Sequence, residues 1–255
     1  MPATSATSSD RITTVHTAQL IITIDGPAGT GKSSVAHRLA RRLGLDFLDT
    51  GAMYRGAALV ALETGVDPSD GPGLAAALEH CGMRFDWTAD PPRIMLGDRD
   101  ISPRIREMDV SGMVSIVAAQ PEVRRMLIAW QRRIGGEHPR LVTEGRDQGS
   151  AVFPAAPVKF YMHADVDVRA ERRVRQLEAS GRTVATDDVR QDIRRRDELD
   201  TTRADSPLVR PDAAVDVDTS SRTLDEVVDL MEAEVRARLG ERLAPPASPG
   251  GGSPA

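Results

Sequence analysis

A glycine-rich segment near the amino end holds residue types that bind phosphate groups. The pattern G-x-x-x-x-G-K-(S/T) is met in full by the run Gly26, Pro27, Ala28, Gly29, Thr30, Gly31, Lys32 and Ser33, which Ser34 follows. The glycines let backbone N–H groups curl around phosphates without obstruction from side chains. Lys32 supplies a mobile cation to the β- and γ-phosphates, and the Ser33 hydroxyl is the expected Mg²⁺ ligand. The segment therefore predicts a site for a nucleoside triphosphate.

The surroundings of this phosphate loop fit the same interpretation. An apolar strand, Leu20–Ile24, is expected to run into the loop and an amphipathic helix, Lys32–Leu43, to leave it. Motors, switches and kinases all use such a loop. The guanine-reading motif N-K-x-D of a GTPase switch is missing from the sequence, because neither of its only two lysines, Lys32 and Lys159, follows an asparagine. A D-x-x-G match at 70–73 lies in an insertion loop and is interpreted as accidental.

Three further polar segments could hold a phosphoryl acceptor. The first, L-D-T-G-A-M-Y-R, places Thr50 and Arg55 where a predicted strand gives way to a helix. The second, E-G-R-D-Q-G, places Arg146 and Asp147 directly after another predicted strand. The third, R-D-E-L-D-T-T-R, brackets Asp200 with two arginines at the end of a helix. Open α/β sheets bind ligands at the carboxyl ends of their strands, so these segments are expected to meet there.

The elements that must position these segments alternate along the chain. Strands are predicted at Leu20–Ile24, Leu45–Leu48, Leu141–Glu144, Val158–Met162 and Ala213–Val217. Helices are predicted at Lys32–Leu43, Ala52–Glu63, Arg104–Ala119, Pro121–Ile134, Val166–Ala179 and Asp187–Glu198, with a last helix opened by a capping box of Thr223 and Glu226. This alternation predicts an α/β fold of three layers, α/β/α, with a central parallel sheet.

One region breaks the alternation. A short helix near Leu74–His80 and two strand-like stretches, Met83–Trp87 and Arg93–Leu96, predict a small antiparallel insertion. The predicted division of the chain is a disordered arm over 1–18, a core over 19–66 and 106–240, the insertion over 67–105 and a flexible tail over 241–255.

Composition excludes several classes of protein. The 255 residues carry a net charge of −5 and a pI near 5.6, which argues against a general nucleic-acid binder. The single cysteine, Cys81, excludes an internal disulfide framework and a cysteine-rich zinc site. The polar stretch 1–10 has no apolar core of a secretory signal, and no apolar run approaches the ~20 residues that span a bilayer. We therefore expect a cytoplasmic protein without a membrane or nucleic-acid partner.

Together these segments resemble bacterial cytidylate kinases, of the nucleoside monophosphate kinase family, from about Leu20 to Leu239. The resemblance rests on I-D-G-P-A-G-T-G-K, L-D-T-G-A-M-Y-R, E-G-R-D-Q-G, V-F-P-A-A-P-V-K-F and R-D-x-x-D-x-x-R, in this order. It implies that the insertion over 67–105 binds the monophosphate and that a helical lid lies at about 165–185. Gln148 and Ser150 depart from the family, which more often has an apolar residue and threonine there.

The resemblance also implies roles for individual residues. Thr50, Arg55 and Arg146, with Tyr54 beside them, are expected to clamp the monophosphate of CMP. Ser115, Arg124 and Asp147 are expected to read the cytosine edge, and Asp200 to contact the ribose hydroxyls. Arg196 and Arg203 are expected near the transferring phosphates with Lys32, and Arg172 of the lid at ATP.

The expected reaction is transfer of the γ-phosphoryl group of ATP to CMP or dCMP with Mg²⁺, by a monomer. A carboxylate such as Asp147 accepts hydrogen bonds from the cytosine amino group, where uracil would present a carbonyl. Two alternatives remain open. One is a kinase of another small acceptor, such as UMP or shikimate, and the other is a nucleotide-dependent switch module.

Each site residue also has a purely structural interpretation. Arg55 and Arg124 could be solvated helix arginines, and Ser115 could bond a helix carbonyl. Arg146 and Asp147 could pair only with each other. Arg196 and Asp200 lie four residues apart and could form a simple helix ion pair.

Overall fold

A computed structural model describes residues 19–179 and 181–244 of the chain. The predicted disordered arm over 1–18 and the predicted tail beyond 244 lie outside the described residues. Gly240–Leu243 forms a 3₁₀ turn, and the Arg140 guanidinium donates to the carbonyls of Arg242 and Leu243. This turn overlaps the first residues of the predicted tail, which begins at 241.

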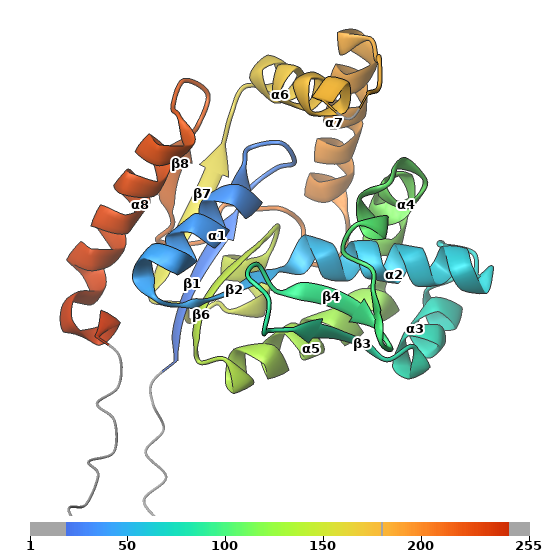
Figure 1. The fold of residues 1–255 in the computed structure, drawn as a ribbon, viewed down its shortest axis with the longest axis horizontal. Coiled ribbons are helices and arrows are strands. Elements are labelled where there is room, and N and C mark those ends of the chain that lie inside the picture. Colours follow the sequence, from blue (N-terminus) through green and yellow to red (C-terminus); the bar gives the residue numbers. More distant parts are fainter. Residues whose placement is uncertain (1–18, 180, 245–255) are drawn as a thin grey trace, which may run out of the picture.

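The centre of the fold is a five-stranded sheet in which every neighbouring pair is parallel (Figure 1). Its strands, in spatial order, are β2 (Asp46–Asp49), β6 (Arg140–Gly145), β1 (Leu20–Asp25), β7 (Val158–His163) and β8 (Val215–Asp218). The predicted parallel sheet is confirmed. The carboxyl ends of its strands all lie at one edge, as in other open α/β sheets.

Helices cover both faces of the sheet. The apolar side chains of β1 point alternately to one face and to the other, so both faces must be covered. Ile22 and Ile24 pack in one core cluster with α1 (Lys32–Leu43) and α8 (Leu224–Leu239). Ile21 packs on the other face with α2 (Thr50–Thr64) and α5 (Pro121–Glu137). The predicted three-layer α/β/α arrangement is therefore confirmed.

The insertion is built as an antiparallel sheet beside α2 and α5. The described elements are α3 (Gly71–His80), β3 (Met83–Asp86), β4 (Arg93–Leu96) and the two-residue strand β5 (Arg99–Asp100), which the sequence did not reveal. Asp70 caps α3 by accepting from the Gly73 N–H, so the D-x-x-G match serves as a helix cap.

No helix within 19–179 or 181–244 combines the length and the hydropathy that crossing a bilayer requires.

Two predicted elements have different limits in the structure. The helix predicted over Arg104–Ala119 is interrupted at Glu107, which is extended at φ −72° and ψ 160°. A 3₁₀ turn, Arg104–Arg106, precedes the break and α4 (Met108–Ala118) follows it. The last strand begins at Val215 rather than Ala213, because Ala213 adopts a left-handed φ of 57°. The predicted capping box of α8 is confirmed.

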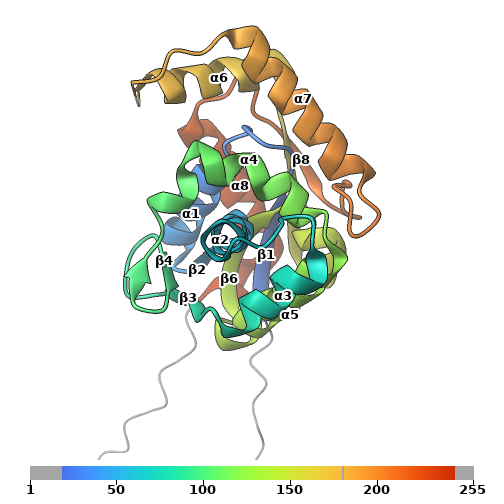
Figure 2. The same cartoon turned by 90° about the vertical axis from the view of Figure 1, so that its right-hand side faces the viewer.

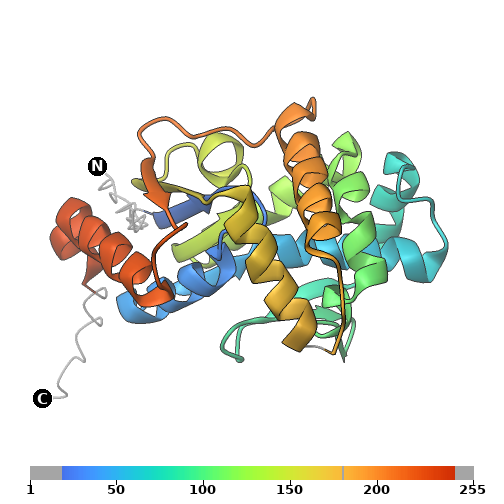
Figure 3. The ribbon, with the colours of Figure 1, turned by 90° about the horizontal axis from the view of Figure 1, so that it is seen from above.

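A helical arm lies over the carboxyl edge of the sheet (Figures 2 and 3). It consists of α6 (Val166–Ala179) and α7 (Thr186–Thr202), which pack against each other. A small apolar cluster that includes Ala170 and Ile193 joins the two helices. The predicted lid at about 165–185 corresponds to α6 and the turn after it, and α7 extends the arm back toward the core.

Two adjacent glycines in the last turns of α5 test the packing of this fold. A Cβ at Gly135 would lie 2.7 Å from Phe153 Cε1, whereas one at Gly136 meets no atom within 4 Å. We expect Gly136→Ala to raise the free energy of unfolding by about 0.5–1 kcal/mol, because alanine is the better helix former. Gly135→Ala should lower it by about 1–3 kcal/mol through overpacking. Denaturant titration measures both, and equal effects would contradict the packing described here.

Candidate functional site

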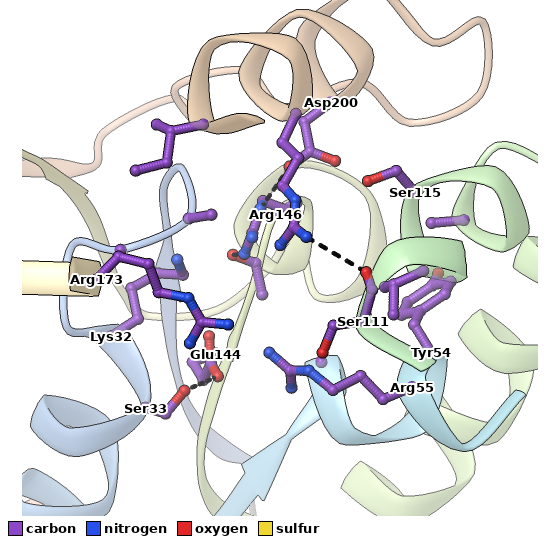
Figure 4. Close-up of a pocket in the computed structure, with 18 of the residues that line it drawn as sticks. Lys32, Ser33, Tyr54, Arg55, Ser111, Ser115, Glu144, Arg146, Arg173 and Asp200 are labelled. Carbon is purple, nitrogen blue, oxygen red and sulfur yellow. Dashed lines mark hydrogen bonds and ion pairs between the residues drawn. The ribbon is translucent and has the colours of Figure 1, made fainter. Parts of the chain in front are cut away.

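The sheet register brings the predicted site segments to one place. Asp25, which ends β1, pairs with Gly145, and Asp49, which ends β2, pairs with Glu144. The phosphate loop, the start of α2 and the Arg146 loop therefore leave the sheet side by side. They surround a cavity of about 710 Å³ that the helical arm closes from above (Figure 4).

The phosphate loop is held in a tight curve by its glycines and by its own lysine. A Cβ at Gly26 would lie 2.0 Å from the Met162 carbonyl oxygen, so only glycine fits there. Gly29 and Gly31 have φ values of 82° and 91°, in the region that side chains avoid. Lys32 Nζ donates to the Pro27 carbonyl at 2.8 Å.

The predicted ATP-binding residues take two positions in the loop. Ala28, Gly29, Gly31, Lys32, Ser33 and Ser34 line the cavity. Gly26, Pro27 and Thr30 do not line it and form the backbone beneath, where the Thr30 hydroxyl donates to the Pro27 carbonyl at 3.2 Å. Contacts within the loop therefore contribute to its curved shape.

The Lys32 ammonium is poorly solvated at its place in the cavity. Its side chain is buried, and burial together with the Arg146 charge lowers the pKa of Lys32 to about 7. Glu144, Asp200 and Asp25 oppose this change of pKa without cancelling it. An anion bound beside the ammonium would favour its protonated form.

Two oxygen-bearing side chains at the end of the loop fit a magnesium ion. Ser33 Oγ donates to Glu144 Oε1 at 2.6 Å, and both residues line the cavity (Figure 4). Burial and the neighbouring Asp49 raise the pKa of Glu144, so a cation there would stabilise its carboxylate. Among the described residues there is no cluster of three or more acidic, histidine or cysteine side chains that could hold a metal. Phosphate oxygens and water would complete the coordination, as Mg²⁺ commonly requires.

The far end of the cavity is built on a buried ion pair. The Arg124 guanidinium, 1% exposed, donates to Asp147 Oδ2, and Arg203 Nη2 lies 3.9 Å from the same oxygen. The Arg124 guanidinium also lies over the Tyr54 ring, 5.6 Å from its centroid. Arg124 is therefore not a solvated helix arginine.

Arg146 and Asp147 choose different partners, so the interpretation that they pair only with each other is wrong. Arg146 Nε donates to Asp200 Oδ2 at 2.8 Å, and Arg203 Nη1 lies 3.6 Å from Asp200 Oδ1. Asp200 thereby joins the loop after β6 to the end of α7.

Arg196 likewise has a different partner from the one that helix spacing suggested. Its Nε lies 2.9 Å from Asp192 Oδ2, and its Nη2 donates to the Ser111 carbonyl at 3.4 Å. This second contact crosses from α7 to α4. The guanidinium is thereby held between the arm and the core.

The remaining predicted acceptor residues line the same cavity. Thr50 Oγ1 donates to the Glu144 carbonyl at 2.7 Å, which fixes the start of α2 against β6. Arg55 Nη1 stands 4.0 Å from Asp49 Oδ1, and the Ser115 hydroxyl points into the cavity from α4 (Figure 4). No residue of 67–105 is among those lining the cavity, where Arg106 is the nearest contributor along the chain. The monophosphate-binding role of the insertion stays a prediction.

Two arginines of α6 line the cavity but differ in their contacts. Arg172, which we expected at ATP, lines the cavity while donating to the carbonyl and hydroxyl of Thr219. Thr219 Oγ1 in turn donates to the Thr30 carbonyl of the phosphate loop at 3.1 Å. Arg173 points into the cavity beside Lys32 and Glu144 (Figure 4), and burial with the charges of neighbouring arginines lowers its pKa.

Several residues of the site were missed in the sequence. Ser111, Glu144 and Arg106 line the cavity, and Asp25 lies beneath it. Asp25 accepts from the N–H groups of Gln148 and Gly149, both at 2.7 Å. Burial raises its pKa to about 7 against the effect of these bonds. The sequence did offer a signal for Asp25, since this carboxylate ends an apolar strand directly before the phosphate loop.

Comparison with known proteins places these residues in a family context. The family model described as cytidylate kinase matches residues 22–237. A cytidylate kinase from Nocardia farcinica (strain IFM 10152) is 48% identical over 86% of this chain and 95% of its own length. One from Salinibacter ruber (strain DSM 13855 / M31) is 42% identical over 87% and 99%. Among solved structures, a gluconokinase from Sinorhizobium meliloti 1021 aligns at 18% identity with a TM-score of 0.46, over 89% of this chain and 96% of its own.

The two lysines allow a matched test of the phosphate loop. Lys32→Ala should lower turnover by at least about a hundredfold, because one preorganised electrostatic contact contributes that much to a transition state. Lys159→Ala removes the same charge from β7, outside the cavity lining, and should leave turnover within about twofold. Steady-state rates with circular dichroism as a check of folding measure this, and equal rates in both variants would exclude the role of Lys32.

Proposed function

This chain belongs to the cytidylate kinase family, and we propose that it transfers the γ-phosphoryl group of ATP to CMP or dCMP, giving ADP and CDP or dCDP. One observation carries this proposal. A single cavity joins the phosphate loop with Lys32 at one end to the buried pair of Arg124 and Asp147 at the other. A donor and an acceptor can therefore lie end to end within it.

The phosphates of both nucleotides would meet in the middle of the cavity. The triphosphate lies along the phosphate loop, and the monophosphate lies between Thr50, Arg55 and Arg146. Arg173 and Arg196 line the same cavity from the helical arm. Phosphoryl transfer needs alignment and charge neutralisation more than covalent help, so these guanidinium groups suffice. The attacking phosphate oxygen of CMP is already anionic and requires no general base.

The base of the acceptor would be read at the other end. The Asp147 carboxylate accepts from Arg124 and has lone pairs left for the amino group of cytosine. Uracil would turn a carbonyl oxygen toward the same carboxylate and place two hydrogen-bond acceptors against each other, which a buried site rejects steeply. Ser115 is placed to add a hydroxyl contact from α4.

Magnesium is the cofactor that the oxygen ligands suit. Ser33 would hold it, with Glu144 as the neighbouring carboxylate. A bound ion would supply positive charge close to the phosphates during transfer.

The helical arm would serve as the lid that excludes water. Arg169 donates to the Ala28 carbonyl at 3.1 Å and forms an ion pair with Asp197 at 2.7 Å, so the base of α6 is tied to the phosphate loop and to α7. Exclusion of water suppresses loss of the phosphoryl group to hydrolysis. We further propose a cytoplasmic monomer without nucleic-acid or membrane partners.

A panel of acceptors tests the proposed reaction. Purified protein with ATP and Mg²⁺ is offered CMP, dCMP, UMP, AMP and shikimate, and ADP formation is followed in a coupled assay. We expect CMP or dCMP to support the highest kcat/KM. Preference for UMP or shikimate would replace the acceptor, and ATP hydrolysis without any phosphorylated acceptor would favour a switch module.

Asp147→Asn tests the reading of the base with little change of shape. The variant should lose at least about tenfold in kcat/KM for CMP relative to UMP, since a charge-assisted hydrogen bond to the amino group is weakened. Asp205→Asn is the matched control, because Asp205 lies 3.8 Å from Arg124 yet does not line the cavity. An equal loss for both acceptors would remove Asp147 from base recognition.

The lowered pKa of Lys32 predicts proton uptake on ATP binding. In the free protein, burial and the Arg146 charge lower this pKa to about 7, so the amine releases its proton far more readily than an exposed lysine does. Phosphate charges raise the pKa again, and binding at pH 8 should take up a fraction of a proton that shrinks toward pH 6. Titration calorimetry in buffers of different ionisation enthalpy measures it. Lys32→Arg keeps a permanent charge and should abolish the uptake; undiminished uptake in that variant would assign the proton elsewhere.

A further inference from the structure

The residue after the proposed base-reading carboxylate is a fully buried amide. Gln148 has no exposed surface, and its backbone N–H is already held by Asp25. A buried side-chain amide is costly unless its donors and acceptors find partners. Of the side chains that bond its amide, Asp147 lines the acceptor end of the cavity, whereas Thr143 and Gln131 do not line it.

Each polar atom of the Gln148 side chain is engaged. Thr143 Oγ1 donates to Gln148 Oε1 at 2.9 Å, and Gln148 Nε2 donates to Gln131 Oε1 at 2.9 Å. The same Nε2 donates to Asp147 Oδ1 at 3.4 Å. The ionised Asp147 carboxylate can only accept, so the Gln148 amide turns its nitrogen rather than its oxygen toward it.

The loop after β6 is thereby attached to α5 at two points. Arg124 and Gln131 lie seven residues apart on α5, about two helical turns, and so face the same side. Arg124 holds Asp147 Oδ2, while Gln148, anchored on Gln131, holds Asp147 Oδ1. Both oxygens of the carboxylate therefore have a donor on the protein, which leaves it little freedom to rotate.

We propose that Gln148 is a positioning residue that orients the Asp147 carboxylate for the acceptor base and so contributes to the preference for cytosine over uracil. This inference rests on the proposed function. Gln148 does not line the cavity, so its effect passes through Asp147 rather than through contact with the nucleotide.

Gln148→Met tests this role, since methionine has similar length and no hydrogen-bond donor. We expect kcat/KM for CMP to fall about five- to tenfold, as the loss of one hydrogen bond predicts, while kcat/KM for UMP stays within about twofold. The KM for ATP should be unchanged because the phosphate loop is not touched. Calorimetric affinities for CMP and UMP should change in the same ratio.

Gln131→Met is the matched control. It removes an equally buried amide from the same chain of bonds but leaves the bond from Gln148 to Asp147 in place. It should lower the midpoint of thermal unfolding while the CMP to UMP ratio stays closer to that of the parent protein than in Gln148→Met, because Gln148 keeps its bonds to Thr143 and Asp147. The double variant removes both amides and should recover part of the lost stability, because neither amide is left without its partner.

The two explanations of Gln148 predict opposite results in the double variant. A positioning role keeps the CMP to UMP ratio low in Gln148→Met and in the double variant, even where stability recovers. A merely structural role makes the CMP to UMP ratio of kcat/KM follow the midpoint of thermal unfolding across all three variants, and this result would overturn the inference. An unchanged ratio in Gln148→Met would overturn it as well. Failure of the parent protein to phosphorylate CMP would instead refute the proposed function.

Discussion

Positive charge held away from water is the constraint on which the site depends. Lys32 and Arg173 face the cavity where burial disfavours their charged forms, and each lies near another cation. Such an arrangement is costly in the free protein and becomes favourable when phosphates enter. Carboxylates around the cations offset part of this free-energy cost. Glu144 and Asp200 raise the pKa of Lys32 more than the other carboxylates do. The site is thus arranged to bind highly charged anions.

The parallel sheet makes this concentration of charge possible. Strands β1, β2 and β6 end in adjacent register, so their loops reach one cavity from three distant parts of the chain. Helices α6 and α7 lie over the same edge (Figure 3), and their Arg172, Arg173 and Arg196 line the cavity. Asp25 and Gln148 sit beneath the cavity and join the phosphate loop to the loop that carries Asp147. A hydrogen bond therefore links the two ends of the site, although each end would bind a different nucleotide.

Most of the fold could be read from local patterns, because apolar alternation and helical periodicity extend over many residues. The errors fell where a single residue decides. Glu107 breaks a helix that its neighbours favour, and Ala213 takes a left-handed conformation that alanine gives no sign of. The strand β5 has only two residues, Arg99 and Asp100, which is too short for any periodic signal. Propensity is a weak guide at such positions, since tertiary contacts outweigh it.

The amino-acid sequence by itself determined the phosphate loop, the parallel sheet and the set of polar segments at its edge, because these depend on neighbours along the chain. Only the tertiary structure decided which polar groups meet. Asp147 pairs with Arg124, 23 residues away, and Arg146 with Asp200, 54 residues away, rather than with each other. Gln148 meets Asp25 across 123 residues. A side chain's partner is chosen by distance in space and by exclusion of water, and neither quantity is written in the local order of residues.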